Sequence, residues 1–242
     1  MKLIKLDAID STNDFLKILS SHGEPDNFTV VTAENQTKGK GQMGAKWLAE
    51  SGKNLTMSVL VKDFLFDNKC VFNLSIIVSL SVIDTLKSLN IPDLTIKWPN
   101  DIMSYNKKIG GILIENTIKS DGRIMSVVGI GLNVNQTNFE NLPNASSLAV
   151  ISNSEFDKDL LLNLIIEKMK DRIESWQTKS DNFWEEYFNS LFRKGIPMPF
   201  KNLENKNFMG IIKGVSPVGK IQILLEDDSV SEFDIKEIQM LY

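Results

Sequence analysis

The chain has 242 residues, of which 42% are hydrophobic and 24% charged, enough for one large domain or two unequal ones with a substantial core. Lys and Arg total 27 against 31 Asp and Glu, a net charge of −4, so we expect no nucleic-acid partner. The single Cys70 excludes an internal disulfide and a zinc centre built from several cysteines. The single His22 excludes a zinc centre built from histidines and a Ser-His triad with a second histidine as base. Cys70 precedes an apolar segment and is interpreted as a core-facing or helix-start residue.

The sequence predicts a cytoplasmic protein without a membrane partner. The N-terminus has no long apolar core of the signal-peptide kind, and no run of about 18 apolar residues occurs anywhere in the chain.

The first part of the chain predicts a strand at Leu3–Ile9 and a helix at Thr12–Leu19, where a Ser N-cap is followed three residues later by Asp. Further strands are predicted at Phe28–Ala33 and at Asn54–Val61, where apolar and small polar residues alternate. Residues 34–53 between them show no periodicity. A loop of that length inside a compact domain is usually functional or disordered.

The middle of the chain predicts a buried helix and three strands. Apolar residues recur at helical spacing over Val71–Leu89. A short strand at Leu94–Trp98 follows, and Ile109–Thr117 and Arg123–Asn133 are predicted to form a hairpin, since both arms are rich in Ile and Val around a Ser-Asp-Gly turn.

The last part predicts two amphipathic helices, at Asp157–Trp176 and Ser180–Phe192. After Gly195 the sequence pattern changes to short predicted strands that contain Gly and Pro, which is typical of a small β-module docked on a main domain. We therefore divide the chain into residues 1–194 and 195–242.

Residues 37–47, TKGKGQMGAKW, hold three glycines and three lysines. Glycines let a backbone approach a ligand and offer N–H groups to phosphate, and nearby lysines neutralise its charge. The stretch is neither a Walker A loop nor a dinucleotide fingerprint. On its own it is as compatible with a solvated surface loop as with phosphate binding.

Two further stretches combine a strand with polar groups. IKWPNDI (96–102) places Asn100 and Asp101 at a strand end, which suits a ligand site or a plain turn. NKKIGGILIE (106–115) places Lys108 before a glycine pair on an apolar strand. A lysine there is either a snorkelling edge residue or a clamp for an oxyanion or phosphate.

VVGIGLNVN (127–135) predicts a strand with Gly129 and Gly131 on the same face. The two bare positions suit either close packing against a helix or a slot for a flat ligand.

In this order, these stretches resemble the catalytic domain of biotin–protein ligases, also called biotin–[acetyl-CoA-carboxylase] ligases. The resemblance covers almost the whole chain and rests on IDSTN (9–13), AENQTKGKGQMGAKW (33–47), KWPND (97–101), KKIGGILIE (107–115), VGIGLNVN (128–135) and the C-terminal β-module. The loop departs from the family's usual GRGRxGRxW pattern. Lys40 keeps the charge of the expected arginine in a chain with only three arginines, whereas Gln42 and Ala45 lose it.

The resemblance implies an α+β fold, with a mixed, largely antiparallel sheet and helices packed on it, as in class II synthetases, plus a C-terminal SH3-like β-barrel module. It implies a ligase that uses ATP and Mg²⁺ to convert biotin to biotinyl-5′-AMP and transfers biotin to a lysine of a carboxylase's biotin carboxyl carrier domain. With eight residues before IDSTN, the short form without an N-terminal DNA-binding domain is expected, and a homodimer is allowed.

Two rival hypotheses remain at this point. A lipoate or octanoate ligase shares the fold and the adenylation chemistry, and a catalytically silent ligand-binding scaffold would be compatible with the missing loop arginines.

Carried over position by position, the resemblance implies overlapping sets of site residues. The biotin-binding set is Ser11, Thr12, Asn13, Gln36, Lys40, Gly41, Gln42, Lys108 and Gly111. The ATP-binding set is Lys40, Trp47, Asn100, Lys108, Gly131 and Asn133. The catalytic pair is Lys108, which clamps carboxyl and phosphoryl oxygens, and Asp101, which orients or deprotonates the acceptor lysine or contacts Mg²⁺ through water. No residue is implied as a direct metal ligand.

Overall fold

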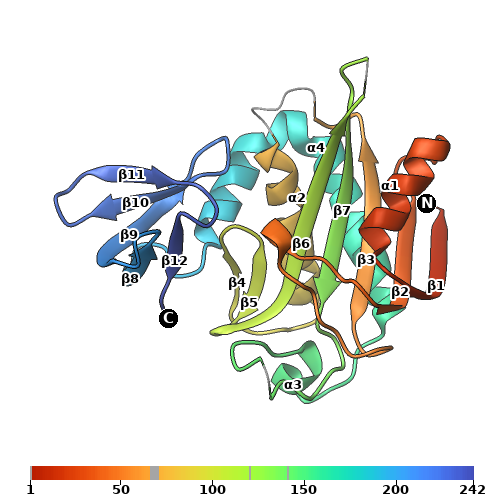
Figure 1. The fold of residues 1–242 in the computed structure, drawn as a ribbon, viewed down its shortest axis with the longest axis horizontal. Helices are drawn as coiled ribbons and strands as arrows, with labels where there is room; N and C mark the ends of the chain where they lie inside the picture. Colours follow the sequence, from red (N-terminus) through yellow and green to blue (C-terminus); the bar gives the residue numbers. More distant parts are fainter. Residues whose placement is uncertain (1, 66–70, 120, 141) are drawn as a thin grey trace.

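A computed structural model of the chain describes residues 2–65, 71–119, 121–140 and 142–242. The interpretation of Cys70 lies outside the described residues. The chain forms two sheets, a large one carrying the helices and a small one at its side built from the C-terminal residues (Figure 1).

The larger sheet has seven strands in the order β1-β2-β3-β7-β6-β5-β4. Its strands are β1 (Leu3–Ile9), β2 (Val30–Gln36), β3 (Leu55–Lys62), β4 (Leu94–Lys97), β5 (Asp101–Ser104), β6 (Lys107–Ile118) and β7 (Ile124–Leu132). Neighbouring strands pair antiparallel, except that β1 and β2 are parallel. The predicted mixed, largely antiparallel sheet is therefore confirmed; β5 was not predicted separately.

Helices cover both faces of this sheet. α1 (Thr12–His22) packs on one face over β2, β3 and β7, while α2 (Phe72–Ser88) and α4 (Lys158–Asn189) pack on each other behind the opposite face (Figure 1). A short helix that the sequence did not predict, α3 (Leu148–Ser152), follows the β7 end. On the face of the sheet that carries α1, a cavity lies beside this helix.

The prediction of two helices at 157–176 and 180–192 is wrong, because α4 runs without a break from Lys158 to Asn189. The intervening Gln-Thr-Lys at 177–179 contains no Gly or Pro, and polar residues of this kind do not end a helix. α4 is held at both ends by buried side chains, including Leu161 and Tyr187. Among the described residues, no helix combines the length and apolar character needed to cross a membrane.

β3 illustrates how alternation sorts side chains between the two faces. Leu55, Met57 and Val59 point into the main core with α2, while Leu60 belongs to the small cluster under α1. Ser58 lies on the same face as Leu60 and is fully buried. The predicted alternation of apolar and small polar residues is confirmed, and its polar positions face the side that holds the cavity.

The C-terminal residues form a five-stranded sheet in the order β11-β10-β9-β8-β12. Its strands are β8 (Pro197–Asn202), β9 (Asn207–Val215), β10 (Ile221–Leu225), β11 (Val230–Phe233) and β12 (Ile238–Met240). Its buried side chains, such as Phe200 and Ile212, belong to the same hydrophobic cluster as those of α2 and β6. The indole N–H of Trp98 donates to the Gly219 carbonyl at 2.8 Å. The predicted small β-module is thus present and packs against the larger sheet and its helices, while the division of the chain into 1–194 and 195–242 stays a prediction.

Candidate active site

A cavity of about 180 Å³ lies between the first turn of α1, residues 37–47, and the middle of β6 and β7. Its floor is built from glycines, because Gly111 of β6 pairs with Gly131 of β7 and Gly129 lies on the same face. A Cβ added at Gly131 would lie 2.5 Å from Trp47 Cε2, and one added at Gly129 would lie 2.5 Å from Asn13 Oδ1. Each glycine therefore clears room for a different wall of the cavity.

The first turn of α1 forms the polar wall at one end. The backbone N–H and the hydroxyl of Thr12 both donate to Gln36 Oε1, at 2.8 and 3.0 Å. From β3, the buried Ser58 hydroxyl lies 2.7 Å from Thr12 Oγ1 and 2.5 Å from Asn13 Oδ1. The Ser11 hydroxyl accepts a hydrogen bond from the backbone N–H of Asp14 at 3.4 Å and so caps the start of α1. These bonds hold the wall's donors and acceptors in fixed directions.

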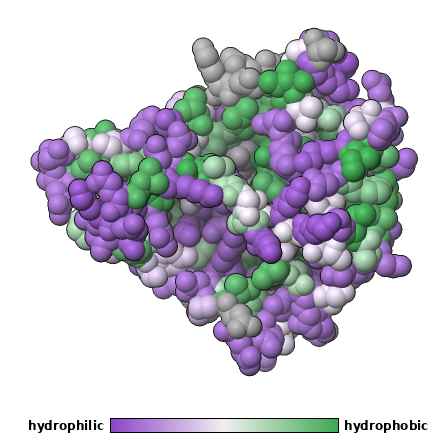
Figure 2. All heavy atoms as spheres, in the orientation of Figure 1, coloured by the Kyte–Doolittle hydropathy of each residue, from purple (hydrophilic) through white to green (hydrophobic). Residues whose placement is uncertain are grey.

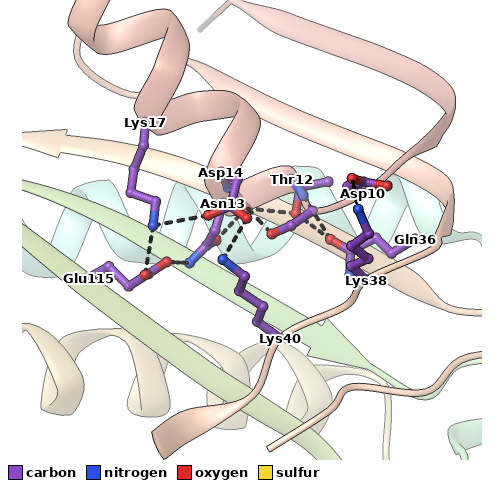
Figure 3. Close-up of polar contacts among 11 residues, drawn as sticks. Asp10, Thr12, Asn13, Asp14, Lys17, Gln36, Lys38, Lys40 and Glu115 are labelled. Atoms are coloured by element: carbon purple, nitrogen blue, oxygen red, sulfur yellow. Dashed lines mark hydrogen bonds and ion pairs between the residues drawn. The ribbon is translucent and has the colours of Figure 1, made fainter. Parts of the chain in front are cut away.

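A chain of charged contacts links this wall to the glycine-lysine loop (Figure 3). Lys40 Nζ lies 2.6 Å from Asp14 Oδ2, and Lys17 Nζ lies 3.1 Å from Asp14 Oδ1 and 2.7 Å from Glu115 Oε1. Glu115 also accepts from the Asn13 amide at 2.8 Å. The polar groups of the cavity wall and the loop cation therefore belong to one network.

The same network shifts the pKa of two of its members, Asp14 and Lys17. Partial burial by itself raises the pKa of the Asp14 carboxyl, but hydrogen bonds from Lys40 and Lys17 outweigh burial and leave that pKa below its usual value. Partial burial by itself lowers the pKa of Lys17, and hydrogen bonds to Glu115 and Asp14 raise it overall. Asp14 and Lys17 are therefore both charged at neutral pH.

Lys108 and Asp101 occupy the opposite end. Lys108 Nζ lies 2.6 Å from Asp101 Oδ1 and 5.7 Å from the centroid of the Trp47 ring. Lys97 Nζ approaches the second oxygen of Asp101 at 3.7 Å. The Lys108 ammonium also lies 3.4 Å from the place a Gly111 Cβ would take, so the glycine leaves this cation exposed to the cavity.

An irregular pairing of β5 with β6 aims Lys108 into the cavity. Ile102 pairs with Gly110, but Met103 pairs with Lys108, so Ile109 is skipped. In a regular strand Lys108 and Gly111, three positions apart, would point to opposite faces. A bulge re-aims a side chain in this way and is frequent beside active sites.

Two polar atoms in the cavity wall lack partners. Among the described residues, Gln42 Oε1 and Trp47 Nε1 are buried and make no hydrogen bond. Buried polar atoms are nearly always paired in folded proteins, so these two atoms are available to pair with a ligand in the cavity.

Residues 6–135, more than half of the chain, match the model of the biotin/lipoate A/B protein ligase family. The chain belongs to this family. It is 27% identical over 232 residues to the bifunctional ligase/repressor BirA of Escherichia coli, covering 93% of this chain and 69% of that protein. It is 26% identical over 214 residues to the biotin–[acetyl-CoA-carboxylase] ligase of Mycobacterium tuberculosis, covering 87% and 79%.

A solved structure extends this likeness over the whole ligase fold. The biotin protein ligase of Aquifex aeolicus in complex with biotin and ATP superposes with a TM-score of 0.80 and 26% sequence identity. The match covers 99% of this chain and 98% of that one, so it includes both sheets.

Most of the predicted site residues line the same cavity, the one between α1, residues 37–47 and the middle of β6 and β7. They are Ser11, Thr12, Asn13, Gln36, Lys40, Gly41, Gln42, Trp47, Asn100, Lys108, Gly111 and Gly131. Asp101 does not line the cavity itself, but it forms an ion pair with Lys108, which does. Asn133 is buried elsewhere, and its amide donates to the Ser146 carbonyl at 3.0 Å. Its assignment to ATP stays a prediction, as do the individual roles of the others.

Among the residues that sequence reasoning missed, three support the cavity wall. Ser58 contacts Thr12 and Asn13, Glu115 accepts from Asn13, and Asp14 pairs with the loop cation Lys40. Small polar residues alternating along an otherwise apolar strand were the available signal for Ser58. For Asp14 and Glu115 the sequence offers only an N-terminal helix carboxylate and an ordinary polar residue within a strand.

Proposed function

We propose that this chain is a biotin–protein ligase, which activates biotin with ATP as biotinyl-5′-AMP and transfers it to a lysine of a biotin carboxyl carrier domain. The observation that carries the proposal is the cavity itself. It has hydrogen-bonding groups at one end, two ammonium groups above a glycine floor, and a fold that matches a biotin ligase in complex with biotin and ATP.

Biotin's uncharged ureido ring suits the wall built on the first turn of α1. A ureido group carries both donors and acceptors, and the wall offers the hydroxyls of Ser11 and Thr12 and the amides of Asn13 and Gln36. These side chains are held by their neighbours rather than by solvent, which favours a rigid ligand of matching pattern. Leu113, on the same face of β6 as Gly111, supplies apolar lining for the rest of the ring system.

The anionic groups of both substrates then come between Lys108, at the opposite end, and Lys40 of the loop. A carboxylate and a phosphate repel each other, and both ammonium groups line the space in which they would meet. The Trp47 indole, beside Gly131 and next to Lys108, offers a flat surface for the adenine. The unpaired Trp47 Nε1 and Gln42 Oε1 are the groups that ligand atoms would satisfy.

In the first step a carboxylate oxygen of biotin attacks the α-phosphorus of ATP. The bond from that phosphorus to the bridging oxygen breaks, pyrophosphate leaves, and a mixed anhydride forms. Lys108 is placed to offset negative charge that develops on the phosphoryl oxygens, and its ion pair with Asp101 fixes the direction of its ammonium group.

In the second step the neutral amine of the carrier lysine attacks the carbonyl carbon of the anhydride. The carbon–oxygen bond to AMP breaks, an amide forms, and the amine gives up a proton. Asp101 is the carboxylate nearest to Lys108 and is our candidate to orient the incoming amine or accept its proton.

The cavity opens toward a larger cleft between the two sheets. Gln42 and Asn100 line both spaces, and the cleft of about 710 Å³ also carries Lys97 and Lys236. The visible surface around both sheets is mostly hydrophilic (Figure 2). We place the exit of pyrophosphate on this side, because its lysines favour a departing anion.

Mg²⁺ would enter with ATP. Among the described residues, no group of three or more His, Cys, Asp or Glu side chains could hold a metal ion. Each oxygen of Asp101 already faces a lysine, so this carboxylate is poorly placed to bind Mg²⁺ directly. Phosphate oxygens and water would then supply most of the ligands of a Mg²⁺ ion, which would neutralise phosphate charge.

The direct test is pyrophosphate release by the purified chain with ATP and Mg²⁺, together with mass analysis of a carrier domain offered as acceptor. Release that requires biotin, with a single added biotinyl group on the carrier, supports the proposal. Release only with lipoate or octanoate would make the chain the other ligase of its family. No release with any of the three acids would favour a silent binding scaffold.

A further inference from the structure

The glycine-lysine loop is closed on itself but is tied to the rest of the cavity by charge. Gly41 N–H donates to the Ala45 carbonyl at 2.8 Å and Trp47 N–H donates to the Gly39 carbonyl at 2.9 Å, so residues 39–47 form a small hairpin. Lys40 has a glycine on either side, and glycines leave the backbone free to turn. The position of the Lys40 ammonium is therefore set by its partner, Asp14.

Asp14 is placed so that it can release Lys40 without losing its own counter-ion. Its carboxylate lies between Lys40 at 2.6 Å and Lys17 at 3.1 Å, and Lys17 is held in turn by Glu115 at 2.7 Å (Figure 3). If Lys40 turns toward another anion, Lys17 remains beside Asp14. The exchange therefore avoids an unpaired, partly buried carboxylate, which is the costly outcome of breaking most such pairs.

We propose that Asp14 is a positioning residue that holds the Lys40 ammonium at the edge of the cavity and competes for it with the anionic end of the ligand. The inference rests on the proposed function, because it takes the biotin carboxylate as that anion. Its consequence is a lowered preference for the charged ligand over an uncharged ligand of the same shape. In exchange, the loop cation is already at the cavity edge before the ligand arrives.

The size of this effect follows from the exposure of the pair. The side chains of Lys40 and Asp14 are 46% and 33% exposed, so solvent and salt screen their attraction. Pairs of this kind change an equilibrium by about twofold to fivefold when they are broken. Asp14 is therefore expected to tune the preference for charge, while the hydrogen-bonding wall sets most of the affinity.

The experiment measures dissociation constants for biotin and for uncharged biotinamide by calorimetry at low ionic strength. Because the two ligands share the same rings and chain and differ in the charge of the end group, the ratio of the biotinamide constant to the biotin constant isolates the charge effect. In Asp14→Asn we expect this ratio to rise about twofold to fivefold, and Asp14→Ser, also neutral, should do the same. Added salt should shrink the difference between wild type and variant.

The chain offers a matched control on the same loop. Lys38 Nζ lies 2.7 Å from Asp10 Oδ2, with side chains 74% and 56% exposed, and neither residue lines the cavity. Asp10→Asn should leave the ratio unchanged. In a Lys40→Met background, Asp14→Asn should also lose its effect, because the loop then carries no ammonium at position 40 that could move between Asp14 and the ligand.

An unchanged or lower ratio in both Asp14 variants would overturn the inference, as would an equal rise in Asp10→Asn. Failure of the proposed function is seen in the wild-type chain instead. A lipoate or octanoate ligase would bind neither biotin nor biotinamide, and a silent binding scaffold would release no pyrophosphate.

Discussion

Replacing Gly131 by alanine tests whether the Trp47 wall serves the nucleotide. The added Cβ would lie 2.5 and 2.6 Å from Trp47 Cε2 and Cζ2. Carbon atoms in normal contact are about 3.5–4.0 Å apart, so the indole has to move by about 1 Å or swing out of the cavity. Trp47 lies on the glycine-lysine loop rather than in the core, so the movement costs little stability and falls mainly on the site.

A displacement of about 1 Å in a catalytic arrangement can cost up to about 100-fold in rate. We therefore expect Gly131→Ala to lower kcat/KM for ATP by about 10- to 100-fold. Biotin affinity should change by less than about threefold, since the α1 wall is not touched. Gly129→Ala is the counterpart, because its Cβ would lie 2.5 Å from Asn13 Oδ1, and we expect it to weaken biotin binding first.

The assay combines ATP-dependent pyrophosphate release at saturating biotin with calorimetric titration of biotin alone. Thermal unfolding of each variant reports whether the fold is retained. Gly23→Ala is the matched control: its Cβ would have an ordinary contact of 3.6 Å with the Leu19 carbonyl oxygen, and neither kinetics nor binding should change.

If Gly131→Ala folds and uses ATP like the wild type, Trp47 is not the nucleotide wall and the reasoning from the glycine floor fails. A variant that loses biotin binding and ATP use to the same extent would show that the two ends of the cavity do not work separately.

Three further predictions concern other residues. Lys108→Ala should abolish pyrophosphate exchange while unfolding like the wild type, whereas the neighbouring exposed Lys107→Ala should retain exchange; near wild-type exchange in Lys108→Ala contradicts its catalytic role. Gln42→Arg should restore a charge to the loop and reduce the escape of biotinyl-AMP, measured as biotinylation of bystander lysines, and unchanged escape and adenylate affinity would mean that another group holds the adenylate. Tyr187→Phe should raise the free energy of unfolding by up to about 1 kcal/mol in urea denaturation, because the Tyr187 hydroxyl is fully buried and has no hydrogen-bond partner among the described residues; a lower urea midpoint would reveal a hydrogen bond.

The sequence by itself determined the features that depend on neighbours along the chain. Alternation over 54–61 predicted which face of β3 is apolar, and the spacing of Gly129 and Gly131 placed both on one face. The Ser11 cap and the start of α1 followed from a local pattern of side chains. The ordered motifs were enough to indicate the family, because each motif is a short run whose residue types are visible without the fold.

Only the tertiary structure decided which of these runs meet and how their side chains are aimed. Asn13 contacts Glu115, 102 positions away, and Thr12 contacts Ser58, 46 positions away. Such contacts depend on how α1 packs on the sheet. Lys108 faces the cavity because β6 skips one residue against β5, and no periodicity in the sequence signals that skip. Strand register is set by the packing of a whole sheet against its helices, so a lysine three positions from a glycine can be assigned to a face only after the sheet has formed.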